Sequence, residues 1–184
     1  MNASFFRLRQ CGALAAGLLA MALSSGGAGA ASEAVNLRFI GRYVPLSCYI
    51  REASIDVALP TVSTQSLSSP GDVAGSTRFD IPIECEGAPG QVRAYFEAGP
   101  TTDASGRLNP LDMSPAPTPS GVQIELLNGD GTVIRVGDRT SVKVVNTTEG
   151  VATLNMPFYA RYYGSGGATP GVVRTYVTYV LDIP

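Results

Sequence analysis

The sequence of 184 residues contains no histidine, and its thirteen basic residues include a single lysine, Lys143. Without histidine, neither a serine nor a cysteine catalytic triad of the usual kind can be assembled. The carboxylates show no glycosidase-like pairing, and the turn 128–131 (NGDG) lacks the glutamate that ends a twelve-residue calcium loop. We therefore expect a protein that is not an enzyme and that binds no metal and no cofactor.

The first thirty residues resemble a secretory signal peptide. Arg7 and Arg9 precede the apolar run 12–23, and Ala28-Gly29-Ala30 has the small-x-small pattern of a cleavage site. The apolar run is too short to span a membrane, and no later stretch approaches the roughly eighteen apolar residues that a span requires. We predict that 1–30 is cleaved during export, which leaves one domain within 31–184 that does not span the membrane.

Positive charge and cysteine are both scarce in the predicted mature chain. Eleven basic and fifteen acidic residues give 31–184 a formal net charge of −4, without a basic cluster, so nucleic acid is a poor candidate partner. Cys11 leaves with the signal peptide, and Cys48 and Cys85 remain. An even pair in an exported chain predicts a disulfide, because two cysteines without histidine do not make a zinc site. Closing this loop contributes roughly 4 kcal/mol in the chain-entropy model.

Short alternating runs separated by turn residues dominate the mature chain, whereas helical periodicity is nearly absent. This pattern predicts an all-β fold, an antiparallel sandwich. In 79–85 the alternation places Phe79, Ile81, Ile83 and Cys85 inward, while Pro82 indicates an edge or a bulge. The expected strands are 48–59, 79–85, 92–97, 122–127, 132–136, 142–145, 152–156, 158–163 and 172–183.

The last expected strand, 172–183, alternates over its whole length. One face carries Val173, Thr175, Val177, Tyr179 and Leu181, and the other carries Arg174, Tyr176, Thr178, Val180 and Asp182. Such alternation is typical of a strand with one buried face.

The segment 31–44 (ASEAVNLRFIGRYV), at the start of the predicted mature chain, also alternates. Its apolar face consists of Val35, Leu37, Phe39, Gly41 and Tyr43. Pro45 removes a backbone donor and separates this segment from the next strand. Two interpretations are open: 31–44 is an edge strand of its own domain, or it is an arm that completes the sheet of another molecule.

An ordered set of motifs across 31–184 resembles the chaperone–usher (type 1-like) fimbrial subunits of Gram-negative bacteria. The motifs are Leu37-x-Phe39-x-Gly41 with a cysteine seven residues later, Phe79-x-Ile81-x-Ile83-x-Cys85, Gly121-Val122-x-Ile124-x-Leu126-Leu127, Phe158-Tyr159-Ala160-Arg161-Tyr162-Tyr163 and Val177-Thr178-Tyr179-Val180-Leu181-Asp182. Two positions depart from the usual pattern, because Ile183 replaces a near-terminal tyrosine and Pro60 replaces a glycine that often follows the position of Leu59.

The resemblance implies an immunoglobulin-like (pilin) sandwich that lacks its last strand. In the family, a periplasmic chaperone fills the resulting groove first, and at the outer-membrane usher the N-terminal extension of the next subunit replaces it. Carried onto this sequence, 1–30 is the signal peptide, 31–44 the donor-strand extension and 45–184 the pilin domain. The inserting face would be the apolar face of 31–44, and the groove edges would be the strand 172–183 and the strand that follows Cys48.

This resemblance makes a polymerising structural subunit of a surface fimbria, with a role in cell adhesion, the leading hypothesis. Its expected partners are neighbouring fimbrial subunits, a periplasmic chaperone and the usher, and its expected route runs through the periplasm to the cell surface. A minor one-domain adhesin or adaptor subunit at the tip remains an alternative. A freestanding periplasmic β-sandwich binding protein, with 31–44 as its own edge strand, is the alternative from another class.

Overall fold

Two antiparallel sheets make up the described part of the chain, which in this computed structural model comprises residues 38, 40–42, 45–88 and 90–184. The predicted signal peptide lies outside the described residues. The strands are β1 (Ser47–Ile50), β2 (Val73–Glu86), β3 (Gln91–Glu97), β4 (Val122–Asn128), β5 (Val133–Ile134), β6 (Val145–Asn146), β7 (Ala152–Gly164) and β8 (Thr178–Asp182). The 3-10 helices are η1 (Thr64–Leu67) and η2 (Arg139–Ser141).

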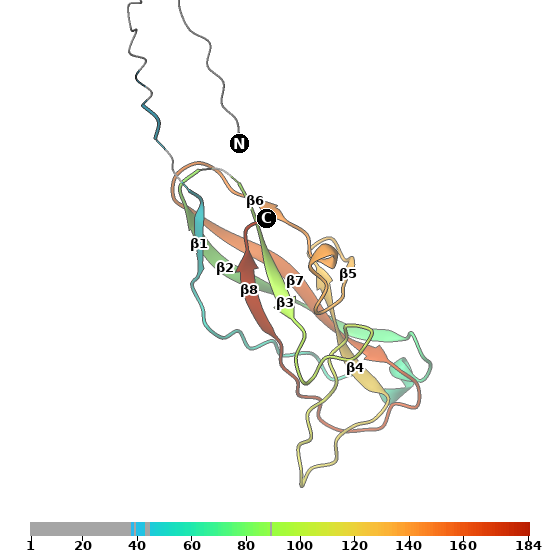
Figure 1. Ribbon diagram of the computed structural model, residues 1–184. Coiled ribbons are helices and arrows are strands. Elements are labelled where there is room, and N and C mark those ends of the chain that lie inside the picture. The colour runs from blue at the N-terminus through green and yellow to red at the C-terminus, as the bar shows by residue number, and fades with distance from the viewer. Residues whose placement is uncertain (1–37, 39, 43–44, 89) are drawn as a thin grey trace, which may run out of the picture. The chain divides into compact units, whose positions relative to one another are not determined.

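The strands form two layers, which Figure 1 shows packed face to face. One sheet has the order β1-β2-β7-β4-β5, and the other has the order β6-β3-β8. The core between them consists of the inward-facing apolar side chains, whose fully buried members include Ile81, Ile83, Val92, Phe96 and Met156. The sequence prediction of an all-β antiparallel sandwich is therefore confirmed.

The long strand β2 bears out one of the two interpretations of Pro82, an edge and not a bulge. β2 lies between β1 and β7, but its ladder with β1 reaches only Ile83, so Pro82 lies at a local edge on that side, and the register shift of β2 falls between Ala74 and Thr77. Pro82 accepts a backbone hydrogen bond from Arg51 at 3.2 Å, just beyond the end of β1. Because proline has no N–H to return that bond, the β1–β2 ladder ends here.

The hairpin between β4 and β5 forms as its turn residues predict. Leu126 pairs with Ile134 and Leu127 with Val133, and Gly131 has a φ of 82°. The Asp130 carboxylate accepts hydrogen bonds from the backbone N–H of Thr132 at 3.0 Å and from its hydroxyl at 2.6 Å. Asp130 therefore serves to close the turn.

The last strand is shorter than its alternation predicts. Only β8 belongs to a ladder, in which Thr178 pairs with Glu97 and Asp182 with Arg93. The residues 172–177 keep the alternating burial of a strand but pair with no strand of the described chain, because β3 ends at Glu97. The Arg174 carbonyl instead accepts from the backbone N–H of Leu111 at 2.7 Å.

Several other expected strands differ in length from the observed ones, and β1 ends at Ile50 although a strand region is expected over 48–59. β5 and β6 have two residues each, shorter than the expected 132–136 and 142–145. In contrast, β7 is continuous through Pro157 and joins the expected strands 152–156 and 158–163. The ladder with β2 runs from Ala152 to Tyr163, through Pro157, and β4 pairs with β7 from Phe158 onward, so β7 is held as one strand.

A carboxylate is buried on the outer face of the larger sheet. Glu125 is 2% exposed, and its two oxygens bind Arg107 (Nε–Oε1, 3.0 Å) and Arg161 (Nη2–Oε2, 2.6 Å). The Arg107 guanidinium also lies 3.6 Å from the ring centroid of Tyr163. A buried charge needs such partners, so this cluster fixes the loop that carries Arg107 against β4 and β7.

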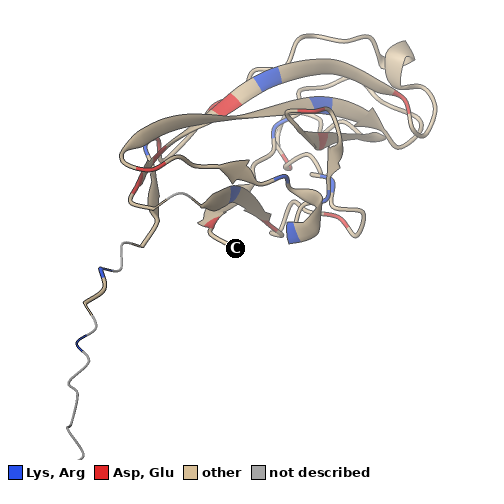
Figure 2. Cartoon of the chain, turned by 90° about the horizontal axis from the view of Figure 1, so that it is seen from above, with Lys and Arg blue, Asp and Glu red and all other residues tan. Residues whose placement is uncertain are grey.

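Charged residues of both signs are scattered along the described chain (Figure 2). Among the residues that the structure describes, no helix has the length and apolar character of a membrane span.

Candidate functional site

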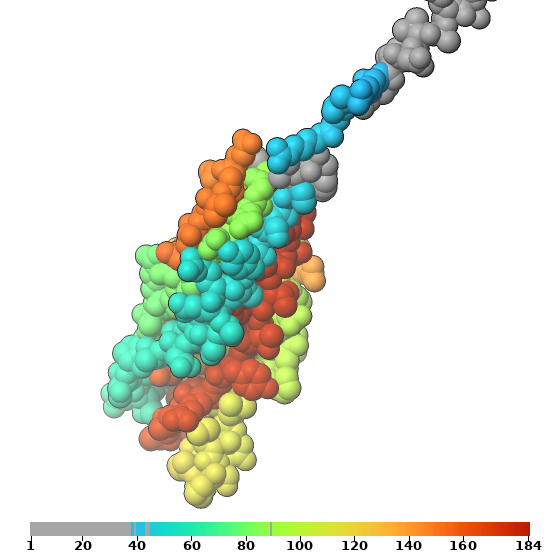
Figure 3. Space-filling view, turned by 90° about the vertical axis from the view of Figure 1, so that its left-hand side faces the viewer, coloured from blue at the N-terminus to red at the C-terminus, as the bar shows by residue number. Residues whose placement is uncertain are grey.

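The edges of the two sheets meet along one flank of the sandwich. The edge strand β1 with its neighbours forms what we call the first wall, residues 46–59, and β8 with the residues before it forms the second wall, residues 172–182. Figure 3 shows the two walls side by side, the first in cyan and the second in red. We call the surface that they share the open flank.

The inward-facing side chains of both walls are only half-buried, although they pack against the core. In the first wall these are Leu46, Cys48, Ile55, Val57 and Leu59, and in the second wall they are Val173, Val177, Tyr179 and Leu181. By contrast, Ile81, Val92 and Met156 in the middle of the sheets are at most 1% exposed. The central strands therefore cover the core completely, whereas the core is partly exposed to solvent along the open flank.

On the side of the open flank, the backbone of the second wall has no hydrogen-bond partner among the described residues before β8. The carbonyls of Arg174 and Tyr176 accept hydrogen bonds from Leu111 N and Thr101 Oγ1, both on the loop that follows β3. Because successive residues of an extended chain direct their N–H and C=O groups to opposite sides, Val173, Thr175 and Val177 direct theirs toward the open flank. This edge thus offers a row of donors and acceptors to another strand.

The first wall offers a similar edge beyond β1. Within the described residues, no backbone–backbone hydrogen bond involves residues 52–62, although 55–59 alternate between half-buried and exposed positions. Ile55, Val57 and Leu59 are thus held by side-chain packing on the core and not by a ladder.

Side-chain contacts of two residues fix the position of β8. Asp182 binds Arg93 of β3 at 2.6 Å and Arg139 of η2 at 3.3 Å. The Tyr179 hydroxyl donates to the carbonyl of Glu52 at 3.3 Å. Burial raises the pKa of Tyr179 above its ordinary value, and the negative charge of Glu52 raises it further.

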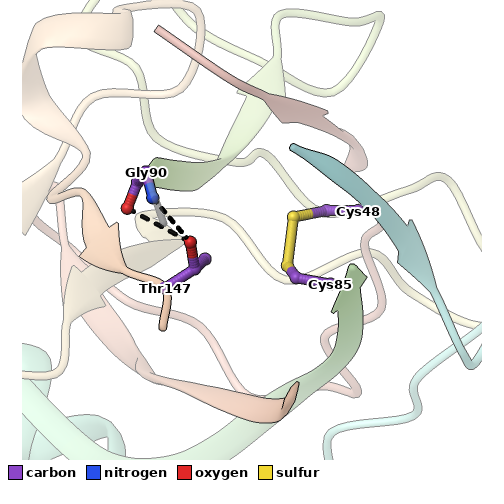
Figure 4. Close-up of a disulfide and its surroundings, with 4 residues drawn as sticks. All are labelled: Cys48, Cys85, Gly90 and Thr147. Atoms are coloured by element: carbon purple, nitrogen blue, oxygen red, sulfur yellow. Dashed lines mark hydrogen bonds between the residues drawn. A yellow bond between two sulfur atoms is a disulfide. The ribbon is translucent and has the colours of Figure 1, made fainter. Parts of the chain in front are cut away.

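The predicted disulfide is present and anchors the first wall. Cys48 and Cys85 are directly paired residues of β1 and β2, with their Cα atoms 4.1 Å apart, and their sulfur atoms are bonded. Nearby, Gly90 N donates to Thr147 Oγ1 at 2.9 Å, which joins β3 to the end of β6 (Figure 4). The short strand β1 is thus held covalently as well as by its ladder.

The second-wall residues predicted from sequence are brought together in one half-buried row: Val173, Thr175, Val177, Tyr179 and Leu181. Of the predicted inserting face, Val35, Leu37, Phe39 and Tyr43 lie outside the described residues. Gly41 is described and exposed, and it is not among the glycines with a positive φ.

The family resemblance implies that the strand after Cys48 is a groove edge, but it does not indicate which residues of that strand line the groove. The structure adds Ile55, Val57 and Leu59 to the half-buried surface. Their period-two alternation with Asp56 and Ala58 was the available signal. The pair of Tyr179 with Glu52 had no signal in the sequence, because the two residues are 127 positions apart.

The comparisons with known proteins agree with this architecture. The family model for FimA, type-1 fimbrial protein A, matches residues 59–184. The F17 fimbrial protein of Escherichia coli is 37% identical over 155 residues, which cover 79% of this chain and 84% of the relative. The major fimbrial subunit SMF-1 of Stenotrophomonas maltophilia is 35% identical, with 79% and 89% covered.

A solved structure gives the same result for the fold. A chain of a chaperone–usher pilus superposes with a TM-score of 0.54 at 16% identity, and the likeness covers 83% of this chain and 97% of that one. The fold is thus the immunoglobulin-like pilin sandwich. The chain belongs to the type-1 fimbrial protein family, and it is a structural subunit of a surface fimbria.

Proposed function

We propose that this subunit polymerises by donor-strand exchange, in which residues 31–44 of one copy or of a related subunit add to the open flank of its neighbour. The half-buried row along the two walls is the observation that carries the proposal. The core is partly uncovered there, beside an edge whose backbone groups have no partner in the described part of the chain. An added strand with alternating apolar side chains would cover the core and pair with these backbone groups.

The segment 31–44 has the chemistry that this surface requires. Its apolar face, defined above, can pack on the half-buried side chains while its backbone pairs with Val173, Thr175 and Val177. At about 1.5–3 kcal/mol for each buried side chain, such a strand contributes ~10 kcal/mol before ordering costs. That is a large share of the stability of a typical domain, so a subunit with an open flank should be unstable alone.

The glycine at position 41 also fits an intermolecular role. Its φ lies outside the left-handed region, so the local backbone does not require glycine here. A residue without Cβ allows close backbone approach, which is useful where an inserted strand meets a narrow part of its site. We therefore attribute glycine at position 41 to its contact with the neighbouring subunit and not to the conformation of its own backbone.

The open flank must also be covered before assembly. In our proposal, 1–30 directs export to the periplasm and is removed, 31–44 is the donor strand and 45–184 is the acceptor domain. A periplasmic chaperone covers the open flank of each new subunit until the usher transfers the subunit to the growing fimbria. Early cover prevents exposed edges and apolar side chains from aggregating.

Refolding of the mature chain, residues 31–184, tests the proposal. In dilute solution the chain alone should give a broad, poorly cooperative urea transition, and an excess of synthetic peptide 31–44 should produce a sharp transition at higher urea. The matched control is the same peptide with Phe39→Asp, which should not rescue. A stable monomer that is indifferent to the wild-type peptide would contradict strand addition.

A further inference from the structure

A single polar side chain interrupts the apolar row of the second wall. Thr175 lies between Val173 and Val177 on the inward-facing side, and its Oγ1 is buried without a hydrogen-bond partner in the described structure. A buried hydroxyl without a partner is unfavourable, and valine would fill nearly the same volume without this cost. The hydroxyl therefore requires a partner that the described chain does not supply.

The inserted strand contains one position suited to that partner. A threonine hydroxyl can donate and accept, so it can bind a backbone carbonyl or N–H, provided that no side chain intervenes. Val35, Leu37, Phe39 and Tyr43 all place an apolar side chain on the inserting face, whereas Gly41 leaves its backbone accessible.

The donor residue that faces Thr175 depends on the direction of the inserted strand. Five positions of the donor, 35 to 43, face five positions of the second wall, 173 to 181, and both rows have a period of two. With the rows aligned end to end, an antiparallel strand places Gly41 opposite Thr175. A parallel strand places Leu37 there and covers the hydroxyl with an apolar side chain.

We propose that Thr175 sets the register of the inserted strand, because its hydroxyl hydrogen-bonds the backbone at Gly41 of the neighbouring subunit. This inference rests on the proposed strand exchange and specifies its alignment. Thr175 is then a specificity-determining residue, since only a strand with glycine at the matching position satisfies it.

The release rate of labelled peptide 31–44 from the refolded mature chain tests the role of the hydroxyl. Thr175→Val should accelerate release by about tenfold, in line with the loss of one buried hydrogen bond. Thr175→Ser, which keeps the hydroxyl, should release the peptide within about threefold of the wild-type rate, as should Thr178→Val on the exposed face of β8. Unchanged or slower release from Thr175→Val would overturn the inference.

Disulfide trapping tests the alignment by an independent readout. The Thr175→Cys chain should cross-link rapidly to peptide Gly41→Cys and slowly to peptide Leu37→Cys. Preferred cross-linking to the Leu37→Cys peptide would overturn the register while leaving strand addition intact. If the wild-type chain retains no peptide at all, strand addition itself fails and the inference falls with it.

Discussion

The Tyr179 hydroxyl donates a hydrogen bond to the backbone carbonyl of Glu52, and this bond joins the two walls of the open flank. The Tyr179 ring also lies 6.1 Å from that of Phe96, between centroids, so the side chain reaches from the core to the surface. One residue thus connects the edge of the smaller sheet with the segment that follows the edge strand of the larger sheet. Three predictions concern this flank, and a fourth concerns a buried carboxylate elsewhere in the larger sheet.

The apolar face of 31–44 should be essential for polymerisation, while its other face should not. Phe39→Asp places a charge on the inserting face, where burial is costly, and should abolish fibres without preventing capture of the subunit by its chaperone. Electron microscopy of cell-surface fibres, together with immunoblots of periplasmic subunit, measures both effects.

The matched control for this prediction is Ile40→Asp. Ile40 belongs to the opposite face of the same segment and is 82% exposed, so fibre yield should stay close to that of the wild type. Equal fibre yields for the Phe39 and Ile40 variants would count against the assigned inserting face.

The disulfide should be required for stable accumulation. Replacement of both Cys48 and Cys85 with alanine removes a link across 37 positions, which contributes roughly 4 kcal/mol in the chain-entropy model. We expect strongly reduced periplasmic recovery, measured by immunoblot against Cys11→Ala, which lies in the predicted signal peptide. Full recovery of the double variant would show that the bridge is dispensable.

The stability of the folded subunit should decline in strong alkali, in part through Tyr179. Its pKa is raised in the folded state, so the folded form binds the proton more tightly than the unfolded form. The resulting stabilisation is complete below the unfolded value of about 10 and is lost as the pH rises toward the higher folded value.

The variant Tyr179→Phe measures this contribution. At neutral pH it should lose about 0.5–1.5 kcal/mol with the hydrogen bond to Glu52. Between about pH 9.5 and 11 the urea midpoint of its peptide complex should fall less than that of the wild type. Parallel pH profiles for the two proteins would exclude Tyr179 as a source of the decline.

The buried carboxylate of Glu125 should be important for stability, although it lies away from the open flank. Glu125→Gln leaves Arg107 and Arg161 without their anion, and because both arginines are about a quarter exposed we expect a loss of about 2–3 kcal/mol. Asp80→Asn, in the exposed pair with Arg78, should cost at most about 1 kcal/mol. Urea unfolding of the peptide complexes compares them, and equal losses would contradict the role of burial.

Sequence patterns predict which segments form strands, but they do not predict how far two distant segments pair. Pro82 was recognised as a ladder breaker, but its place next to β1 depends on how far β1 runs, which is a property of two segments over thirty residues apart. In the same way, the alternation of 172–183 predicts a strand but not its partner. Within the described residues its first half belongs to no ladder, because β3 ends at Glu97.

Local sequence patterns alone predict the all-β class, the cysteine pair, the inward-facing row of the last strand and the apolar face of 31–44, because period-two alternation and turn chemistry are local properties. The fold is needed to show that the two sheet edges meet along one flank and leave Ile55, Val57, Leu59 and the second wall half-buried. It also shows that Thr175 Oγ1 has no hydrogen-bond partner among the described residues and that Tyr179 reaches Glu52. These features depend on contacts between residues far apart in the chain, which no local pattern encodes.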